Sequence, residues 1–294
     1  MTFRTPRMAV LCLALAALAA TLAGQDSPRF QTELLAKGYV FTQGPAWSKQ
    51  GFLIFSDTPA DQLLQWTPGS DPVVFRQDAH GPCGNAFDSE GRLYTCESRA
   101  RRVTRTEKNG AITVVAERWE GKRLNAPAQI VISHNDHVYF TDPAFASQSE
   151  HRELDFHGVY HLPPHGPIKL IGHFSTRPTG IALSLNGRLL YVANADGRTV
   201  VAYDLDRAGD ATASRVLISG IDGVPGGMRV DDKGNLYVAA KGIAIYSPEG
   251  KLLRTIPSRE PPSNCAFGEA DGKSLFITAR GNVYRLRVEA NGEK

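Results

Sequence analysis

The chain repeats one pattern of apolar and polar positions six times. In each copy a short apolar strand runs into a polar turn, and a second strand follows in which apolar and polar residues alternate, as in a half-buried β-strand. The second strands are GFLIFSD from Gly51, GRLYTCE from Gly91, DHVYFTD from Asp136, GRLLYVAN from Gly187, GNLYVAA from Gly234 and GKSLFITA from Gly272. Their starts are separated by 40, 45, 51, 47 and 38 residues, which indicates a repeat architecture.

A third strand in each copy ends at a turn glycine. These glycines are Gly69, Gly110, Gly166, Gly209, Gly250 and Gly292. Glycine recurs at this point because tight hairpins need a positive φ, which a side chain disfavours. Five copies continue into a fourth strand, with the sequences DPVVFRQ, AITVVAER, PIKLIGHF, SRVLISG and KLLRTIP.

Four strands in each of six repeats predict an all-β fold, a six-bladed β-propeller, in which neighbouring blades cover each other's faces. The last copy lacks its fourth strand, and a spare segment, Phe30 to Tyr39, precedes the first copy. We therefore expect this N-terminal strand to complete the last blade, so that no sheet edge stays open. A sandwich or barrel would not explain one missing strand and one spare strand. No segment predicts a helix.

Residues 1–24 have the pattern of a secretory signal. Two arginines precede an apolar run from Met8 to Leu22, and small residues follow near Ala23. The run has 15 residues, fewer than the ~20 that span a bilayer, so we favour cleavage over the alternative, a retained anchor. The sequence thus predicts an exported protein, periplasmic or extracellular, with a signal peptide over 1–24 and a single propeller domain over 25–294. No membrane contact is expected after cleavage.

The charge and the cysteine count exclude two further classes. The formal charge of +3 falls to +1 without the two signal arginines, and no concentrated basic face suggests a nucleic-acid partner. The mature part keeps three cysteines, an odd number that argues against a disulfide framework. We expect Cys96 and Cys265 to be buried and Cys83 to be an accessible thiol, with a Cys83–Cys265 bridge as the alternative. His161 and His165 flank two prolines, which exclude a helix, and we interpret them as surface residues of a turn.

Strand alternation also places a candidate site. Residues just before the innermost strands should ring one mouth of the central channel. They are Gln43, Cys83, Gln129, Thr179, Gly226 and Asn264. The ends of the second strands should form a wider rim, made of Asp57, Glu97, Asp142, Asn194, Lys241 and Arg280.

The predicted inner ring is polar and uncharged, whereas acid–base catalysis needs a carboxylate or histidine close to the substrate. Asp142 is the strongest candidate for a catalytic residue, with Asp222, Cys83 and His80 weaker. The alternative for the rim acids is that they cap turns through the backbone. The sequence therefore leaves open whether the protein is an enzyme.

Several motifs lie in order along nearly the whole mature chain. They are QGPAW from Gln43, CESRARRVTR from Cys96, EGKRLNAP from Glu120, YFTDP from Tyr139, ELDFHGVY from Glu153, GVPGGMRVD from Gly223 and NCAFG from Asn264. With these motifs the chain resembles the gluconolactonase/regucalcin (senescence marker protein, luciferin-regenerating-enzyme-like) family. The resemblance implies a six-bladed propeller that hydrolyses sugar lactones with one divalent cation, such as calcium or zinc, at the channel mouth.

The chain departs from this family at the cation site. Where the family has a metal-binding glutamate, asparagine and aspartate, this sequence has Gln43, Thr179 and Gly226. Ala128 and Gln129 replace an Asn-Asp pair, Cys83 replaces a further asparagine, and Arg123, Asn125 and Asn264 are kept. A hard dication gains most of its affinity from charged oxygen ligands, so we expect no metal and no other cofactor.

We therefore expect a small neutral or sugar-like ligand, a sugar lactone or sugar acid, at the channel mouth. The residues that would bind it are Gln43, Cys83, Arg123, Asn125, Gln129, Thr179, Gly226 and Asn264. Two alternatives stay open: an active lactone or ester hydrolase with a rebuilt mechanism, and a non-catalytic interaction propeller. The oligomeric state is not indicated.

Overall fold

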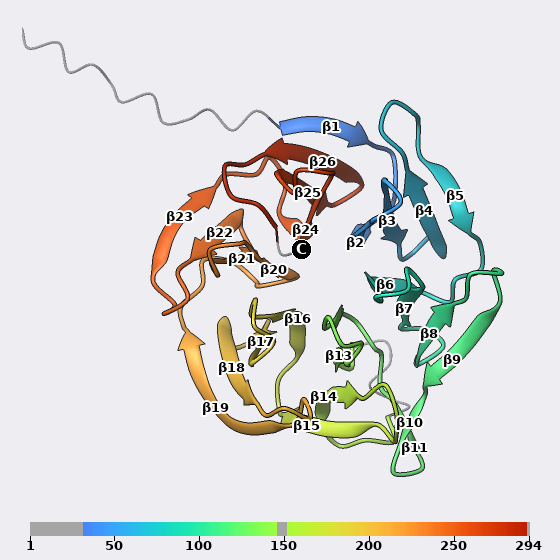
Figure 1. The fold of residues 1–294 in the computed structure, drawn as a ribbon, viewed down its shortest axis with the longest axis vertical. Coiled ribbons are helices and arrows are strands. Elements are labelled where there is room, and N and C mark those ends of the chain that lie inside the picture. Colours follow the sequence, from blue (N-terminus) through green and yellow to red (C-terminus); the bar gives the residue numbers. More distant parts are fainter. Residues whose placement is uncertain (1–31, 146–151, 293–294) are drawn as a thin grey trace, which may run out of the picture.

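The computed structural model describes residues 32–145 and 152–292 and contains strands without any helix in these ranges. Six four-stranded antiparallel sheets surround a central axis as the blades of a propeller (Figure 1). The predicted fold is confirmed. Within the described ranges, no helix has the length and apolarity needed to cross a membrane.

Each blade runs from an innermost strand at the axis to an outermost strand at the rim. Blade 1 contains β2 (Thr42–Ser48), β3 (Phe52–Asp57), β4 (Gln62–Trp66) and β5 (Val73–Arg76). Blade 2 contains β6 (Pro82–Phe87), β7 (Leu93–Glu97), β8 (Arg102–Thr106) and β9 (Ile112–Ala116). Blade 3 contains β12 (Ile130–Ile132), β13 (Val138–Asp142), β14 (His157–Leu162) and β15 (Lys169–Phe174).

The remaining blades follow the same order. Blade 4 contains β16 (Pro178–Leu183), β17 (Leu189–Asn194), β18 (Thr199–Leu205) and β19 (Ala211–Ile218). Blade 5 contains β20 (Met228–Val230), β21 (Leu236–Ala239), β22 (Ile243–Tyr246) and β23 (Leu252–Ile256). Blade 6 contains β24 (Pro262–Gly268), β25 (Ser274–Ala279) and β26 (Asn282–Arg287). A short hairpin of β10 (Arg118–Trp119) and β11 (Lys122–Arg123) leads from blade 2 into blade 3.

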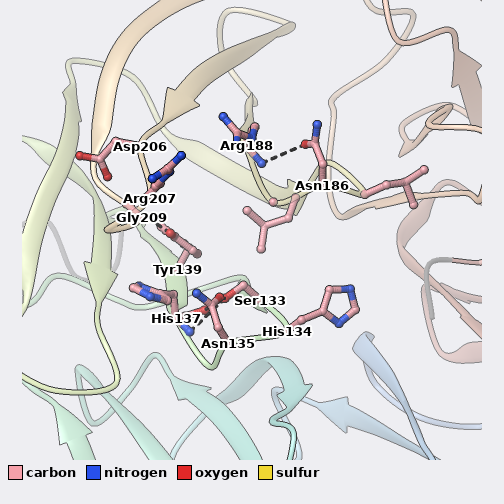
Figure 2. A pocket seen from close by; sticks show the side chains of 13 residues that line it. Ser133, His134, Asn135, His137, Tyr139, Asn186, Arg188, Asp206, Arg207 and Gly209 are labelled. Atoms are coloured by element: carbon pink, nitrogen blue, oxygen red, sulfur yellow. Dashed lines mark hydrogen bonds between the residues drawn. The ribbon is translucent and has the colours of Figure 1, made fainter.

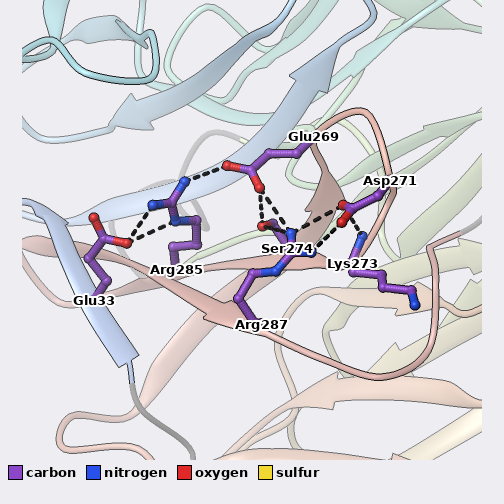
Figure 3. Close-up of polar contacts among 7 residues, drawn as sticks. All are labelled: Glu33, Glu269, Asp271, Lys273, Ser274, Arg285 and Arg287. Atoms are coloured by element: carbon purple, nitrogen blue, oxygen red, sulfur yellow. Dashed lines mark hydrogen bonds and ion pairs between the residues drawn. The ribbon is translucent and has the colours of Figure 1, made fainter.

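The N-terminal strand β1 (Thr32–Ala36) completes blade 6 by pairing antiparallel with β26 (Figure 1). This closure is the one that the spare and missing strands predict. An ion-pair chain reinforces it, since Arg285 on β26 binds Glu33 on β1, with Nη2 and Oε2 2.6 Å apart, and also binds Glu269 (Figure 3). The predicted targeting segment, 1–24, lies outside the described residues.

The core lies between adjacent blades, where alternating strand residues interdigitate. At the closure, for example, Trp47 of blade 1 stacks on Phe276 of blade 6, with ring centroids 5.2 Å apart. Glycines let the innermost strands approach each other closely near the channel mouth. A Cβ on Gly44 would lie 2.0 Å from the carbonyl oxygen of Cys83, and one on Gly180 would lie 2.0 Å from that of Gly226. The mouth is therefore narrowed by backbone contacts between neighbouring blades.

Two expectations about single side chains are wrong. His161 is fully buried at the end of β14, although His165 is exposed in the following turn. Cys83 is only 4% exposed, because it belongs to the apolar cluster that blades 2 and 3 share, which also contains Tyr94 and Cys96. All three described cysteines are free and buried, so the alternative Cys83–Cys265 bridge is not formed.

Candidate functional site

The predicted ring positions lie at corresponding places in the blades. Gln43, Cys83 and Thr179 are each the second residue of an innermost strand, and Asn264 is the third residue of β24. The other two ring positions, 129 and 226, come just before β12 and β20. The inner strands meet at the axis in Figure 1, which explains how residues far apart in sequence reach one site.

Three of these side chains form a continuous chain of amide hydrogen bonds between blades. Asn264 donates from Nδ2 to Oε1 of Gln129 over 2.7 Å, and Gln129 donates from Nε2 to Oε1 of Gln43 over 3.3 Å. Gln43 in turn donates from Nε2 to Oγ1 of Thr58 over 2.6 Å, and Thr58 donates to the carbonyl oxygen of Pro82. Each amide oxygen accepts and each amide nitrogen donates, so the network is neutral and runs in one direction.

This network links blades 1, 3 and 6 directly and reaches blade 2 through Pro82. Asn264 is fully buried and Gln129 is nearly so, while Gln43 is partly exposed. A primary amide has two N–H donors and two acceptor lone pairs, so Gln43 keeps unused hydrogen-bonding capacity. Sequence reasoning missed Thr58, the end of the chain, because that threonine follows β3 in an ordinary turn.

Two further ring positions, 179 and 226, offer little to a ligand. The hydroxyl of Thr179 donates to the carbonyl oxygen of Pro225 at 2.8 Å and so ties blade 4 to blade 5. Gly226 offers no side chain, and a Cβ there would lie 2.4 Å from the carbonyl oxygen of Ser263. Any larger residue at 226 therefore requires the backbone to shift.

Asp142 is fully buried and its carboxylate holds the loop before β12. Its two oxygens accept the backbone N–H groups of Asn125 and Ala126, each at 2.7 Å. Burial raises the pKa of the Asp142 carboxyl to about 7, while these two hydrogen bonds oppose the rise. Because both oxygens are engaged, the geometry of Asp142 is that of a loop cap.

The loop that Asp142 caps carries Arg123 and Asn125, two residues that match the motif of the resembled family. Asn125 donates from Nδ2 to the carbonyl oxygens of Asp142 and Phe156, at 3.2 and 2.9 Å. Its Oδ1 is buried and has no hydrogen-bond partner among the described residues. Arg123 donates to the carbonyl oxygen of Ala100 at 2.8 Å, so its guanidinium is partly used in the fold. The free acceptor of Asn125 is the polar atom here that a hydroxyl or water would satisfy.

The other candidate residues are less well placed for chemistry. Burial raises the pKa of the Cys83 thiol, which keeps the sulfur in its less nucleophilic protonated form. Asp222 is exposed and pairs with Lys241, with carboxylate and ammonium 3.2 Å apart. His80 is exposed and adopts a positive φ of 55° in a turn. Asp222 and His80 lie outside the amide chain, whereas Cys83 contacts it, because its thiol is within hydrogen-bonding reach of Gln43 and Thr58.

The rim acids of blades 1 and 2 are also engaged within the fold, Asp57 by backbone N–H groups and Glu97 by arginines. Asp57 accepts the backbone N–H groups of Val40 and Phe41, both at 3.0 Å. Glu97 is buried and paired with Arg76 and Arg102, at 2.7 and 2.6 Å. Their geometry favours the capping and packing alternative for the rim.

The donor set at the mouth does not fit a divalent cation. In the described ranges no group of three or more His, Cys, Asp or Glu side chains could hold a metal. The amide oxygens of Gln43 and Gln129, the nearest substitutes, already accept hydrogen bonds within the chain. A hard dication binds several oxygens and favours charged ones, which this neutral network does not provide.

Comparisons of the sequence place the chain among lactonase-like propellers. The profile of the SMP-30/Gluconolactonase/LRE-like region matches residues 41–281. The chain is 34% identical to a gluconolactonase of Zymomonas mobilis, over 88% of this chain and 82% of that protein. It is 23% identical to the regucalcin of Xenopus laevis, over 84% of this chain and 85% of that protein.

Solved structures agree with the sequence comparison. A gluconolactonase from Xanthomonas campestris superposes with a TM-score of 0.82 at 31% identity, covering 88% of this chain and 89% of that one. A regucalcin from Agrobacterium tumefaciens, at 18% identity and a TM-score of 0.78 over 90% of this chain and 95% of that one, shares the fold. The chain belongs to the SMP-30/gluconolactonase/LRE-like family.

Proposed function

We propose that the channel mouth of this lactonase-family propeller binds a small, neutral, hydroxylated ligand of the sugar or sugar-lactone class without a divalent cation. The observation that carries the proposal is the amide chain of Asn264, Gln129 and Gln43. It occupies the mouth with neutral donors and acceptors.

The chemistry of the mouth favours a neutral, hydroxylated ligand over an ion. A bound ion would be left without an opposite charge within the amide chain, which is costly in a partly buried site. Sugar hydroxyls both donate and accept hydrogen bonds, as do the unused groups of Gln43. The unpaired Oδ1 of Asn125 also calls for a hydroxyl donor. The proposed ligand therefore matches both groups, and the relatives named gluconolactonase suggest its class.

The proposal treats the site as a binding site with a degenerate metal centre. The carboxylate closest to a catalytic role, Asp142, already has both oxygens in loop hydrogen bonds. Since a general base needs an accessible lone pair, hydrolysis through Asp142 would first require the 123–127 loop to open. Export to the periplasm or outside the cell is part of the same proposal and rests on the pattern of residues 1–24.

Calorimetric titration tests the proposal with glucono-δ-lactone and glucose as probes, in buffer with and without a chelator. We expect saturable binding of at least one probe that the chelator does not change, and no lactone hydrolysis above the uncatalysed rate. Binding or hydrolysis that appears only when calcium, zinc or manganese is added would contradict the proposal. Chelator-resistant hydrolysis would instead favour the rebuilt hydrolase.

A further inference from the structure

A cavity lies on the face of the propeller opposite the proposed ligand site. It has a volume of about 410 Å³ and opens between blades 3 and 4 (Figure 2). Three turns form its walls, after β12 (133–136), after β16 (184–188) and after β18 (206–210). The volume is within the range typical of small-molecule sites.

A carboxylate–imidazole–imidazole series reaches the wall of this cavity. Asp210 Oδ1 lies 3.0 Å from Nδ1 of the buried His161, and Nε2 of His161 lies 2.7 Å from Nδ1 of His137. His137 lines the cavity and is partly exposed (Figure 2). Lys169 holds the other oxygen of Asp210 at 2.6 Å. The series therefore runs from an ion pair through a buried ring to a cavity residue.

The proton positions follow from this geometry. Lys169, followed by His161, lowers the pKa of Asp210, so Asp210 is ionised and can only accept. His161 must then donate from Nδ1, which leaves its Nε2 as an acceptor, because burial lowers the pKa of His161 and keeps the ring neutral. The 2.7 Å bond requires His137 to donate from Nδ1. The lone pair of His137 is thereby left on Nε2.

Neighbouring groups fix the two rings in place. The ring of Tyr139 stacks on His161 with centroids 4.8 Å apart, and its hydroxyl donates to the carbonyl oxygen of Gly209 at 3.0 Å. A Cβ on Gly209 would lie 2.8 Å from Nδ1 of His137 and closer still to the hydroxyl of Tyr139. The 206–210 turn thus approaches the rings only because residue 209 is glycine.

Other unpaired groups share the cavity. Arg188 and Arg207 line it and have no ion-pair partner among residues 32–145 and 152–292. His137 Nε2 makes no hydrogen bond to the described part of the chain either. The carboxylate of Asp206 offsets part of the positive charge of the two arginines. Its Oδ1 accepts hydrogen bonds from backbone N–H groups of its own turn. The cavity therefore combines an excess positive charge with one imidazole acceptor.

We propose that this cavity is a second binding site, independent of the channel mouth, for a small hydroxycarboxylate. The carboxylate of the ligand pairs with Arg188 and Arg207, since guanidinium groups match carboxylate geometry. A hydroxyl of the ligand donates to Nε2 of His137. The hydrogen bonds that run from His137 through His161 to Asp210 keep this nitrogen unprotonated, so that it can accept. A metal ligand set is not formed at this place, because no group of three or more ligating acids, cysteines or histidines is found in the described ranges.

The test is calorimetric titration of the whole mature protein with gluconate, with acetate as the probe lacking the hydroxyl. Glucose, the probe lacking the carboxylate, is expected at the channel mouth, so its affinity should be the same in the wild type and in the cavity variants. We expect saturable gluconate binding, and about tenfold or greater weakening in His137→Phe, Arg188→Gln and Arg207→Gln, the size of one charge-assisted hydrogen bond. The two arginine variants lie on the surface and keep the fold intact. Gln50→Met, at an exposed position outside the lining of the cavity, should leave gluconate affinity unchanged.

The role of Asp210 has its own readout. In Asp210→Asn the amide can donate to His161 Nδ1, which reverses both hydrogen bonds and moves the proton of His137 to Nε2. Nitrogen-15 spectra of the histidine rings should show this change of tautomer together with weaker gluconate binding. Equal gluconate affinity in all cavity variants, no saturable gluconate binding at all, or a wild-type His137 protonated on Nε2 would overturn the proposal.

Discussion

Asn264 of blade 6 and Gln129 of blade 3 meet at the channel mouth, where Nδ2 of the asparagine donates to Oε1 of the glutamine over 2.7 Å. The two residues are 135 positions apart in sequence, and both are buried. Their contact is the central link of the neutral network on which the proposed function depends. It also joins two blades that are not neighbours along the chain.

Removing this link should destabilise the fold moderately. Gln129→Met keeps the approximate side-chain volume but leaves Nδ2 of Asn264 and Oε1 of Gln43 without their partner. We expect the free energy of unfolding to fall by about 1–3 kcal/mol, the cost of unsatisfied buried polar groups. Urea denaturation measures the change, with Gln50→Met, at an exposed position, as the control. Equal stability of the two variants would mean that the amide chain contributes nothing to the fold.

Position 226 should resist any side chain. Gly226→Ala places a Cβ 2.4 Å from the carbonyl oxygen of Ser263, and the overpacking should cost about 1–3 kcal/mol. Gly197→Ala is the matched control, since its Cβ would meet side chains and no backbone, with Asn194 at 3.2 Å and Thr199 at 3.5 Å as the nearest. Thermal unfolding of both variants compares them. If Gly226→Ala is as stable as the control, the mouth is open enough to accept the aspartate of the related lactonases.

The buried carboxyl of Asp142 should give the stability a distinct pH dependence. Its pKa of about 7 in the fold lies above that of an unfolded aspartate, near 3.9, so the folded protein binds the proton more tightly. The free energy of unfolding should therefore rise as pH falls from about 7 toward about 4, by up to about 1.4 kcal/mol per pH unit from this group. Asp142→Asn should be less stable because one loop N–H loses its acceptor.

The difference between the wild type and Asp142→Asn isolates this contribution. Urea titrations at several pH values should show that the difference in unfolding free energy grows as pH falls through this window. A difference that is constant between pH 4 and pH 7 would contradict the raised pKa.

The closing strand should be needed for a soluble fold. A chain starting at Thr42 lacks β1 and leaves the edge of β26 unpaired, which promotes edge-to-edge association. We expect this truncation to aggregate, whereas a control chain starting at Gln25 should unfold cooperatively. Size-exclusion chromatography and circular dichroism distinguish the two. A monomeric, cooperative chain starting at Thr42 would show that the pairing of β1 is dispensable.

The thiols should be protected in the folded protein. The three cysteines of the mature protein, Cys83, Cys96 and Cys265, are buried and free. Native mature protein should therefore react slowly with a thiol reagent, whereas denatured protein should react with three equivalents of it. Rapid labelling of one cysteine would restore the expectation of an accessible Cys83. Reaction of only one thiol per chain after denaturation would indicate the Cys83–Cys265 bridge.

The fold followed from the sequence because its signal is periodic. Strand alternation and turn glycines recur six times, and the spare segment from Phe30 to Tyr39 can replace the missing strand in one way, which β1 confirms. The same alternation located the ring positions of the mouth. The amide chain could not be predicted, since it depends on the orientations of side chains that are far apart in sequence. Gln43 and Gln129 are 86 positions apart, and Gln129 and Asn264 are 135 positions apart.

The burial of single side chains depends on what covers them, which the local pattern does not specify. Alternation indicates which face a side chain occupies but not what covers it, so Cys83 was expected to be exposed. The prolines beside His161 predict a turn and therefore a surface position for the histidine, and the turn is formed. Its actual cover comes from the 206–210 turn of the next blade, and its partner Asp210 is 49 positions away. No local pattern carries that information.

The central claim is that neutral amides occupy the place where related lactonases are expected to hold a cation. Calorimetric titration of the chelator-treated mature protein with calcium, zinc and manganese tests it most directly. The account predicts no saturable binding in the micromolar range for any of the three, because Oε1 of Gln43 accepts a hydrogen bond from Gln129 and Oε1 of Gln129 accepts one from Asn264. Stoichiometric micromolar binding that Gln43→Met and Gln129→Met abolish would contradict it.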